Sequence, residues 1–205
     1  MSAFGTLSAS TTACLFIEFQ NEFASEGGKL NAAVQPCMDA VGTVDNASKV
    51  LEACRAKGIK VLHAPITFSD DFRELSTAGY GILANVKAGE CFKASQWGGA
   101  IIDKMQPTPE EIVVAGKRGL CGFASTNLDF ILRQHGITTL AICGFLTNCC
   151  VESSMRTAYE KGYKVITLHD CCGATSVEQH EAAVKFTFPM FSVPQTSSDF
   201  IASLE

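Results

Sequence analysis

The sequence has no cluster of basic residues and no long apolar run. Its 205 residues carry 16 Lys and Arg against 21 Asp and Glu, a net charge of −5. Without a basic patch, nucleic acid is not an expected partner. No stretch approaches the ~20 apolar residues that span a bilayer, and the first residues lack the basic-then-apolar order of a secretory signal. We therefore expect a cytoplasmic protein with no nucleic-acid or membrane partner.

Cys-x-x-Cys pairs are also absent, although the chain holds ten cysteines. A zinc site usually needs such pairs, and the doublets at 149–150 and 171–172 do not place two thiolates well around one ion. Cys14, Cys54 and Cys143 lie inside apolar periodic segments, where a free cysteine behaves as a small hydrophobic residue. We expect a reducing compartment and mostly structural thiols.

Apolar runs of strand length alternate with helical patterns along the whole chain. No repeat, low-complexity tract or linker divides it, so residues 1–205 are expected to form a single domain. Most of the runs are continuous rather than alternating, which is typical of parallel strands buried on both faces. The six expected strands are residues 13–19, 58–64, 111–115, 138–144, 163–168 and 188–193. The expected helices are residues 38–57, 125–134, 151–161, 178–186 and 197–204.

Helix, glycine and strand recur in an order that indicates βαβ units with right-handed crossovers. The expected fold class is α/β, a three-layer α/β/α sandwich with a six-stranded parallel sheet. Ligands of such sheets bind beyond the carboxyl ends of the strands. Glu18 ends the first expected strand, Lys117 follows the third, and Cys149-Cys150 follows the fourth. An acid, an amine and a thiol are thus expected at one edge.

The thiol after the fourth strand has a physical reason to be reactive. It lies in the first turn of an expected helix, where free N–H groups and the positive end of the helix dipole favour thiolate and lower its pKa. Backbone N–H groups there can also hold an oxyanion. A nearby Lys117 ammonium would stabilise the thiolate, and Glu18 could act as general base and acid.

Three segments carry a resemblance to a known family. They are ACLFIEFQNEF from residue 13, KRGLCGFASTNLDFILRQHGI from residue 117, and ICGFLTNCCVESSMRTAYEKGYKVITLHDCCGA from residue 142. In this order they resemble the three catalytic motifs of isochorismatase-like cysteine hydrolases, and the similarity runs over residues 11–200. The resemblance implies the isochorismatase-like hydrolase fold, no cofactor, a small-molecule substrate and a homo-oligomer.

Carried over residue by residue, the family's Asp–Lys–Cys triad falls on Glu18, Lys117 and Cys150. The family nucleophile directly precedes Val, which favours Cys150 over Cys149. The resemblance also implies a cis peptide at Phe145–Leu146, with the amides of Leu146 and Cys150 as the oxyanion hole. Glu18 departs from the family, which has Asp. The extra methylene moves the carboxylate by about 1 Å, and such a displacement can cost ~100-fold in rate.

No metal is expected. The metal-binding nicotinamidase branch places Asp-x-His and a second His after the second strand, whereas this chain has a single His63 there, with Asp70 and Asp71 further on. A single histidine at a strand end is more often a hydrogen-bonded structural residue than a ligand. Asp70 and Asp71 are interpreted as loop or cap residues.

Residues 68–97 form the least regular part of the chain and are rich in aromatic side chains. Such a loop could line an apolar pocket or pack against another subunit. From this loop Phe68 and Trp97 are candidate pocket residues. Phe23 is a further candidate, because the first motif fixes its location.

The leading functional hypothesis is an amidase-type cysteine hydrolase. It would cleave a C–N bond of a small amide, carbamoyl or ureido compound through a thioester on Cys150. Two alternatives remain among enzymes: vinyl-ether hydrolysis of isochorismate, which needs no thiol, and a catalytically weak paralogue, because Glu18 replaces Asp. A third alternative is a non-catalytic interaction or redox protein, which Glu18 and the cysteine content favour.

Overall fold

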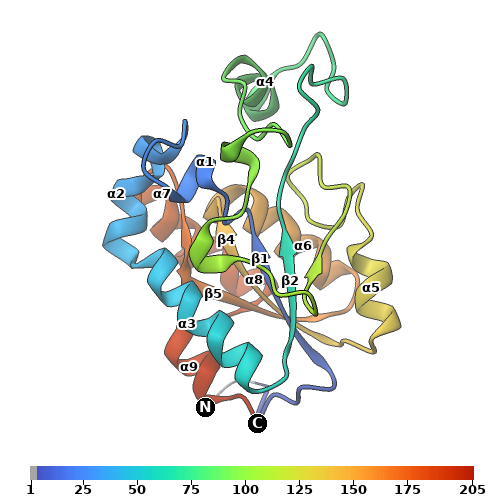
Figure 1. Ribbon diagram of the computed structural model, residues 1–205. Coiled ribbons are helices and arrows are strands. Elements are labelled where there is room, and N and C mark those ends of the chain that lie inside the picture. The colour runs from blue at the N-terminus through green and yellow to red at the C-terminus, as the bar shows by residue number, and fades with distance from the viewer. Residues whose placement is uncertain (1–3) are drawn as a thin grey trace.

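The structure, a computed structural model, describes residues 4–205 and contains one six-stranded sheet (Figure 1). All strand pairs are parallel, in the order β3-β2-β1-β4-β5-β6. This confirms the predicted α/β fold with a six-stranded parallel sheet. The strands are β1 (Thr12–Ile17), β2 (Lys60–Ala64), β3 (Ile112–Val113), β4 (Thr139–Phe145), β5 (Lys164–Gly173) and β6 (Val193–Gln195).

Nine α-helices connect and flank these strands within residues 4–205. Helices α2 and α3 lie in front of the sheet in Figure 1, where α3 packs against α9, whereas α6 lies behind the sheet and packs against α8. The helices are α1 (Asn21–Ala24), α2 (Asn31–Val41), α3 (Thr43–Ala56), α4 (Gly81–Ala88), α5 (Leu128–Gln134), α6 (Glu152–Glu160), α7 (Val177–Ala182), α8 (Phe188–Phe191) and α9 (Ser197–Ala202). No helix among the described residues is both long and apolar enough to cross a bilayer.

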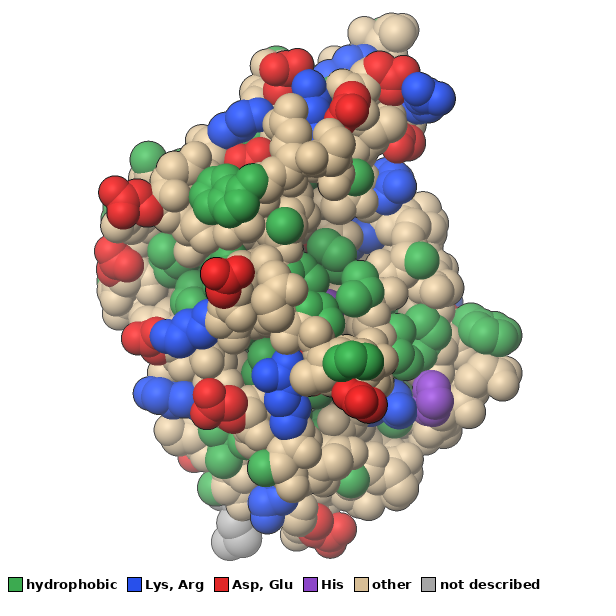
Figure 2. Space-filling model, in the orientation of Figure 1, with side chains coloured by type: hydrophobic (Ala, Val, Ile, Leu, Met, Phe, Trp, Pro, Cys, Tyr) green, Lys and Arg blue, Asp and Glu red, His purple; other side chains and the backbone are tan. Residues whose placement is uncertain are grey.

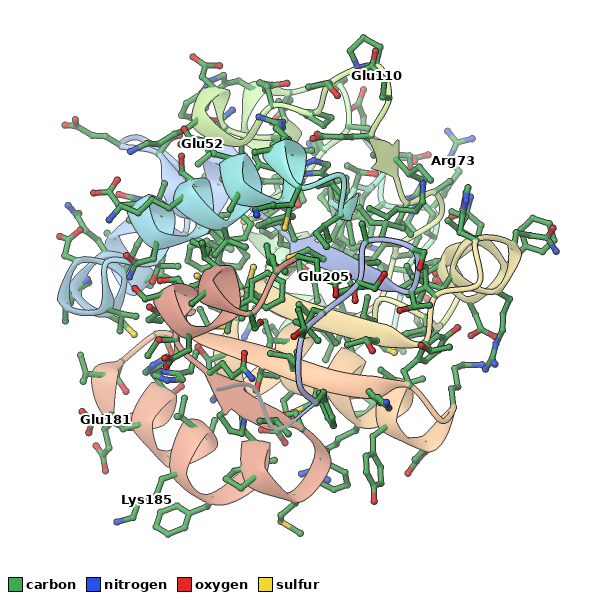
Figure 3. The ribbon with its side chains drawn as sticks, turned by 90° about the horizontal axis from the view of Figure 1, so that it is seen from below. Glu52, Arg73, Glu110, Glu181, Lys185 and Glu205 are labelled. Carbon is green, nitrogen blue, oxygen red and sulfur yellow. The ribbon has the colours of Figure 1, made fainter. Side chains whose placement is uncertain are left out.

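The core follows from the apolar strands. Every residue of β1 and β4 is buried, as expected for central strands covered on both faces. Most Asp, Glu, Lys and Arg side chains lie outside this core, and the buried exceptions are Glu18, Glu22, Lys93 and Lys117. Seen from below in Figure 3, Glu52, Glu110, Glu181 and Lys185 are at the periphery of the molecule. The sheet therefore supplies a rigid, apolar frame whose carboxyl edge carries the polar residues of interest.

Two sequence predictions of local structure were wrong. Residues 188–193 do not form one strand, because residues 188–191 are helix α8 and β6 begins only at Val193. Pro189 lies at the start of α8, where its missing N–H costs nothing, and Phe188 is buried while Met190 is exposed. The expected helix at 38–57 is interrupted, since Gly42 adopts φ 77° between α2 and α3.

The segment between β2 and β3 extends from the body of the molecule. It carries α4, which Figure 1 shows at the top, above the carboxyl ends of β1, β2 and β4. The prediction of an irregular segment missed this helix, which has only eight residues. Its position places α4 over the edge where Glu18, Lys117 and Cys150 follow their strands.

Candidate active site

Glu18 follows the last residue of β1 at the carboxyl edge of the sheet. Ile17 is paired with Ala64 of β2 and with Gly144 of β4, and the Glu18 N–H donates to the Ala64 carbonyl over 3.2 Å. Glu18 has φ 56°, a left-handed conformation that non-glycine residues rarely adopt and that costs about 1–3 kcal/mol. A strained backbone at this point turns the carboxylate out of the strand and into the site.

Gln20 stabilises the strained turn with its side-chain hydrogen bonds. Its side-chain amide donates to the carbonyls of Ile66 (2.8 Å) and Gly99 (2.7 Å), and its Oε1 accepts from the Ile66 N–H (2.9 Å). The side chain is fully buried, so these bonds are made away from water and tie three chain segments together. They stabilise the path of the chain immediately after Glu18.

Lys117 lies in the segment after β3, and its ammonium reaches Glu18. Its Nζ contacts Glu18 Oε1 and donates to the Gly119 carbonyl over 2.9 Å. The Lys117 side chain is completely buried, and that of Glu18 is 3% exposed. Burial alone would lower the pKa of Lys117, but its interactions with Glu18 and, once that thiol ionises, with Cys150 outweigh burial and raise the pKa. The amine is therefore a buried, paired cation beside the thiol.

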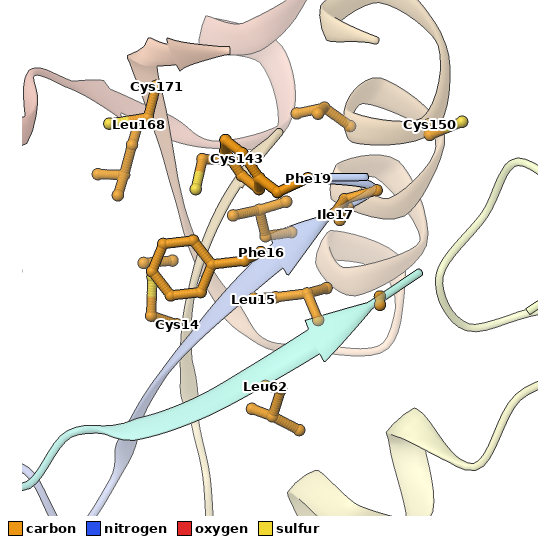
Figure 4. Close-up of a cluster of buried hydrophobic side chains, with 14 of the residues drawn as sticks. Cys14, Leu15, Phe16, Ile17, Phe19, Leu62, Cys143, Cys150, Leu168 and Cys171 are labelled. Atoms are coloured by element: carbon orange, nitrogen blue, oxygen red, sulfur yellow. The ribbon is translucent and has the colours of Figure 1, made fainter. Parts of the chain in front are cut away.

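Cys150 lies in the helical turn Thr147–Val151, between β4 and α6. Its carbonyl accepts from Ser154 Oγ (2.6 Å), and Ser154 Oγ accepts from the Gly122 N–H (2.8 Å), which links the Cys150 turn to the segment after Lys117. The peptide bond Phe145–Leu146 is cis, which confirms the sequence prediction. In Figure 4 the Cys150 sulfur lies at the start of the helix and points away from the strands.

The strand before Cys150 approaches β1 too closely for a side chain. Gly144 has φ 128°, and a Cβ at this position would lie 1.9 Å from the Ile17 carbonyl oxygen. Only glycine fits such an approach. Gly144 thus brings the ends of β1 and β4 together, and with them the segments that carry Glu18 and Cys150.

The charge state of Cys150 differs from the sequence expectation. The neighbouring Cys149 thiol, burial and the negative charge of Glu18 raise the pKa of Cys150, and Lys117 lowers it by less. Cys149, hydrogen-bonded to Cys150, has a lowered pKa. The expected lowering at Cys150 is therefore outweighed in the resting protein. Its thiol is protonated there, and a base must remove the proton before sulfur can act as a nucleophile.

Glu18 and Cys150 open into one cavity of about 290 Å³. Residues from α1, α2 and α4 close it on the side away from the sheet. Its lining residues are Glu18, Phe23, Leu30, Ala33, Val34, Ile82, Asn85, Val86, Phe92, Leu120, Leu146, Cys150 and Thr175. In Figure 2 hydrophobic side chains are visible in the hollow between the body of the molecule and the segment at the top that carries α4. The cavity gives a small molecule access to the thiol and the carboxylate together.

The three aromatic residues expected at the pocket lie in different places. Phe23 lines the cavity and stacks on Phe145, with ring centroids 5.3 Å apart. Against expectation, Phe68 and Trp97 do not line it. The Phe68 backbone is hydrogen-bonded to Phe92 and Ala94. This pairing turns the Phe68 ring into the interior of the segment between β2 and β3, where it is fully buried beside Phe72. The Trp97 side chain is 56% exposed on the surface.

Several cavity residues were not identified from the sequence. Ile82, Asn85 and Val86 belong to α4, and Leu120 follows Lys117 by three residues. The helical spacing of residues 82, 85 and 86 could have indicated one face of a short helix. Nothing in the sequence indicates that this face covers the active edge, because the path of the long connection sets it.

The residues considered as metal ligands have other partners. His63 Nε2 lies 2.9 Å from Glu111 Oε2, and burial lowers the pKa of His63 in spite of that carboxylate. Asp70 accepts from Ser95, and Asp71 pairs with Arg73 at 3.0 Å. Within residues 4–205 no group of three or more His, Cys, Asp or Glu is arranged to hold a metal ion.

Comparisons with known proteins agree with this geometry. A family model described as the isochorismatase domain matches residues 12–199. The chain is 32% identical to the ureidoacrylate amidohydrolase RutB of Rhizobium rhizogenes over 97% of this chain and 85% of that protein. It is 34% identical to the enzyme of the same name from Agrobacterium fabrum, over 80% of this chain and 77% of that protein.

A solved structure shares the fold over nearly the whole chain. The cysteine hydrolase of Pseudomonas syringae superimposes with a TM-score of 0.82 at 23% identity, covering 99% of this chain and 98% of that one. At this identity the likeness concerns the fold alone.

Proposed function

The chain belongs to the isochorismatase family of hydrolases, and on that premise we propose that it cleaves a C–N bond through a thioester on Cys150. The substrate is a small amide, carbamoyl or ureido compound. The observation that carries this proposal is the shared cavity, into which the Cys150 thiol and the Glu18 carboxylate both open. The names of the relatives, amidohydrolases that act on ureidoacrylate, support the same bond type.

Glu18 is the base in the first half of the proposed cycle. It takes the proton from the Cys150 thiol as sulfur attacks the carbonyl carbon, and the carbonyl oxygen becomes an oxyanion. The amides of Leu146 and Cys150 then stabilise this oxyanion by donating hydrogen bonds. Both residues line the cavity, which supports that role. The C–N bond breaks as Glu18 returns its proton to nitrogen, and ammonia or an amine leaves.

Water completes the cycle with the same residues. Glu18 takes a proton from a water molecule, the remaining hydroxide attacks the thioester carbonyl, and the C–S bond breaks. The Cys150 sulfur recovers the proton from Glu18, and the carboxylic or carbamic acid is released. Lys117 stays protonated throughout, since it lies between two negative groups as each one forms. Its charge favours the thiolate of Cys150.

Turnover of an amide panel tests this proposal. Ammonia release would be measured for the wild type and for Cys150→Ser and Cys150→Ala, with the fold of each checked by circular dichroism. We expect activity in the wild type alone. Equal activity in the wild type and in Cys150→Ala would overturn the covalent route and would favour protonation by Glu18, the chemistry of vinyl-ether hydrolysis.

We further propose that the protein works in the cytoplasm as a homo-oligomer. All ten cysteines carry free thiols, which suits a reducing compartment. Exposed Tyr80 and Trp97 could be covered by a second copy. Light scattering coupled to size-exclusion chromatography would measure the oligomeric state, and a monomeric mass at micromolar concentration would contradict this part.

A further inference from the structure

The walls of the cavity beside Cys150 carry no positive charge. None of its described lining residues is Lys, Arg or His. Most of the wall is apolar, and it comes from four separate parts of the chain. The apolar lining residues are Phe23, Leu30, Ala33, Val34, Ile82, Val86, Phe92, Leu120 and Leu146.

The cation that contacts the carboxylate of the site, Lys117, is already neutralised. Lys117 Nζ contacts Glu18 and donates to the Gly119 carbonyl over 2.9 Å. Its whole side chain lies out of solvent. Lys117 is absent from the lining of the cavity, so a substrate anion bound there does not contact this ammonium directly.

Arg118, the next residue, is also held away from the cavity. Its guanidinium donates to Thr67 Oγ1 (3.2 Å) and to the Lys117 carbonyl (3.1 Å), and its Nε lies 3.4 Å from Glu74 Oε1. Arg118 is also absent from the lining of the cavity.

The polar groups of the lining are few and are neutral or negative. Glu18 and Cys150 are the reacting groups, and Thr175 Oγ1 donates to Gln179 Oε1 over 2.9 Å. Asn85 of α4 adds a neutral amide. A carboxylate in this cavity would lose its water without gaining a cation, and it would lie near the negative charge of Glu18. Both effects are strongly unfavourable.

Resting on the proposed function, we propose that the substrates are primary amides whose acyl group is short, apolar and uncharged. The apolar wall binds the acyl chain, and anionic amides are excluded. The cavity of about 290 Å³ is just below the usual range of ligand sites, roughly 300–1,000 Å³, so the acyl group must be short. The chain would then share its bond chemistry with the ureidoacrylate enzymes but not their substrate, which carries a carboxylate.

A matched pair of amides separates charge from size. In 4-methylpentanamide an isopropyl group replaces the carboxylate of succinamate, and the two molecules are nearly isosteric. Binding of each to the inactive Cys150→Ala protein would be measured by calorimetry, and kcat/KM of each by the wild type. We expect the neutral amide to be favoured by at least roughly 100-fold in both measurements. Equal or better binding of succinamate would overturn the inference.

A variant with an added charge makes the test reciprocal. Ile82 lines the cavity from α4 and is 38% exposed, so a lysine there has room and access to water. Ile82→Lys should shift the preference toward succinamate by at least about tenfold. The matched control Ile82→Met removes the branched side chain without adding charge and should keep the preference for the neutral amide. An unchanged preference in Ile82→Lys would contradict exclusion by charge.

The binding and turnover measurements test the substrate class and the proposed reaction independently. If the wild type hydrolyses succinamate better than 4-methylpentanamide, the inference on substrate class is wrong and the proposed hydrolase remains. If Cys150→Ala binds the neutral amide while the wild type hydrolyses neither, the proposed reaction is wrong and the assignment of the cavity stands. If neither amide binds at millimolar concentration, the inference is wrong.

Discussion

Cysteines occupy two very different regions of this molecule. Cys14, Cys143 and Cys171 lie on adjacent central strands with no exposed surface, and Cys14 is hydrogen-bonded to Cys143. Cys150 lies at the carboxyl edge and opens into a cavity. Figure 4 shows the two regions on opposite sides of the close-up, with the Cys150 sulfur directed away from the others.

The comparison shows that burial alone does not distinguish a reactive thiol from a structural one. Burial raises the pKa of Cys143 to about 12, and the pKa of Cys150 is raised too, by Cys149 and by burial. What Cys150 has in addition is access for a substrate, a carboxylate that can take its proton, and the Lys117 charge that favours the thiolate. Reactivity at this edge therefore depends on neighbours and access rather than on a low resting pKa.

The largest expected effect is that of removing the Cys150 thiol. Cys150→Ala should lower kcat/KM by roughly 10⁴-fold or more, because the nucleophile and the base act as a unit. The melting temperature should change little, since the side chain borders a cavity and the loss creates no closed void. Steady-state kinetics and a thermal melt measure the two quantities. Retained activity would place Cys150 with the structural thiols.

Removing the charge of Glu18 should separate catalysis from thiol reactivity. Glu18→Gln should lower kcat/KM by about 10²- to 10⁴-fold, because the base is lost. The Glu18 charge raises the pKa of Cys150, so its removal lowers that pKa and increases the thiolate fraction at a given pH. Alkylation of Cys150 by iodoacetamide should therefore become faster, with its pH profile shifted to lower pH.

Mass spectrometry of the Cys150 peptide after timed alkylation measures that shift. Gln keeps an oxygen that can accept from the Lys117 ammonium, so the variant retains one half of the buried contact. The wild type alkylated in parallel is the control. Slower alkylation together with slower catalysis would mean that Glu18 activates the thiol in the resting state, contrary to this account.

Shortening the acid tests whether Glu suits this chain better than the Asp of its family. Glu18→Asp keeps the charge but withdraws the carboxylate from Lys117 by about one bond length, which should cost roughly 10- to 100-fold in kcat/KM. Asp adopts the left-handed backbone more readily than Glu, so the stability of the fold should not fall through the backbone. A rise in kcat/KM would show that Glu18 is a weakened triad member.

The smallest effect is expected for a structural thiol. Cys143→Ala removes one buried sulfur from β4 and should cost about 1 kcal/mol of unfolding free energy, with kcat/KM unchanged. Urea unfolding and steady-state kinetics of the same preparation measure both. A loss of activity in folded Cys143→Ala would contradict the assignment of Cys143 as a purely structural thiol.

The sequence predicted the sheet because apolar strand runs and glycine-terminated helices are local signals. Continuous burial of residues 12–17 and 139–145 follows directly from their composition. The resemblance supplied the cis bond at Phe145–Leu146, which composition and spacing do not indicate. The break at Gly42 and the helix at Pro189 were missed because a left-handed glycine and a proline at a helix start leave the apolar pattern intact.

The walls of the site were harder to predict than its reacting groups. Glu18, Lys117 and Cys150 each follow a strand, so topology alone brings them to one edge. Phe68 and Trp97 belong to a long connection whose path depends on many tertiary contacts, and its aromatic content did not say which rings face the substrate. The strained φ of Glu18 likewise belongs to a turn stabilised by long-range hydrogen bonds of Gln20, which no local signal in the sequence indicates.

The central claim, a thioester on Cys150, is tested most directly by trapping the acyl-enzyme. The wild type would be mixed with excess 4-methylpentanamide, and with an anionic amide in parallel, quenched in acid within milliseconds to seconds, digested, and mapped by mass spectrometry. The account predicts an acyl adduct on the Cys150 sulfur that disappears as substrate is exhausted. Ammonia release without any adduct, or an adduct on Cys149 in its place, would contradict it.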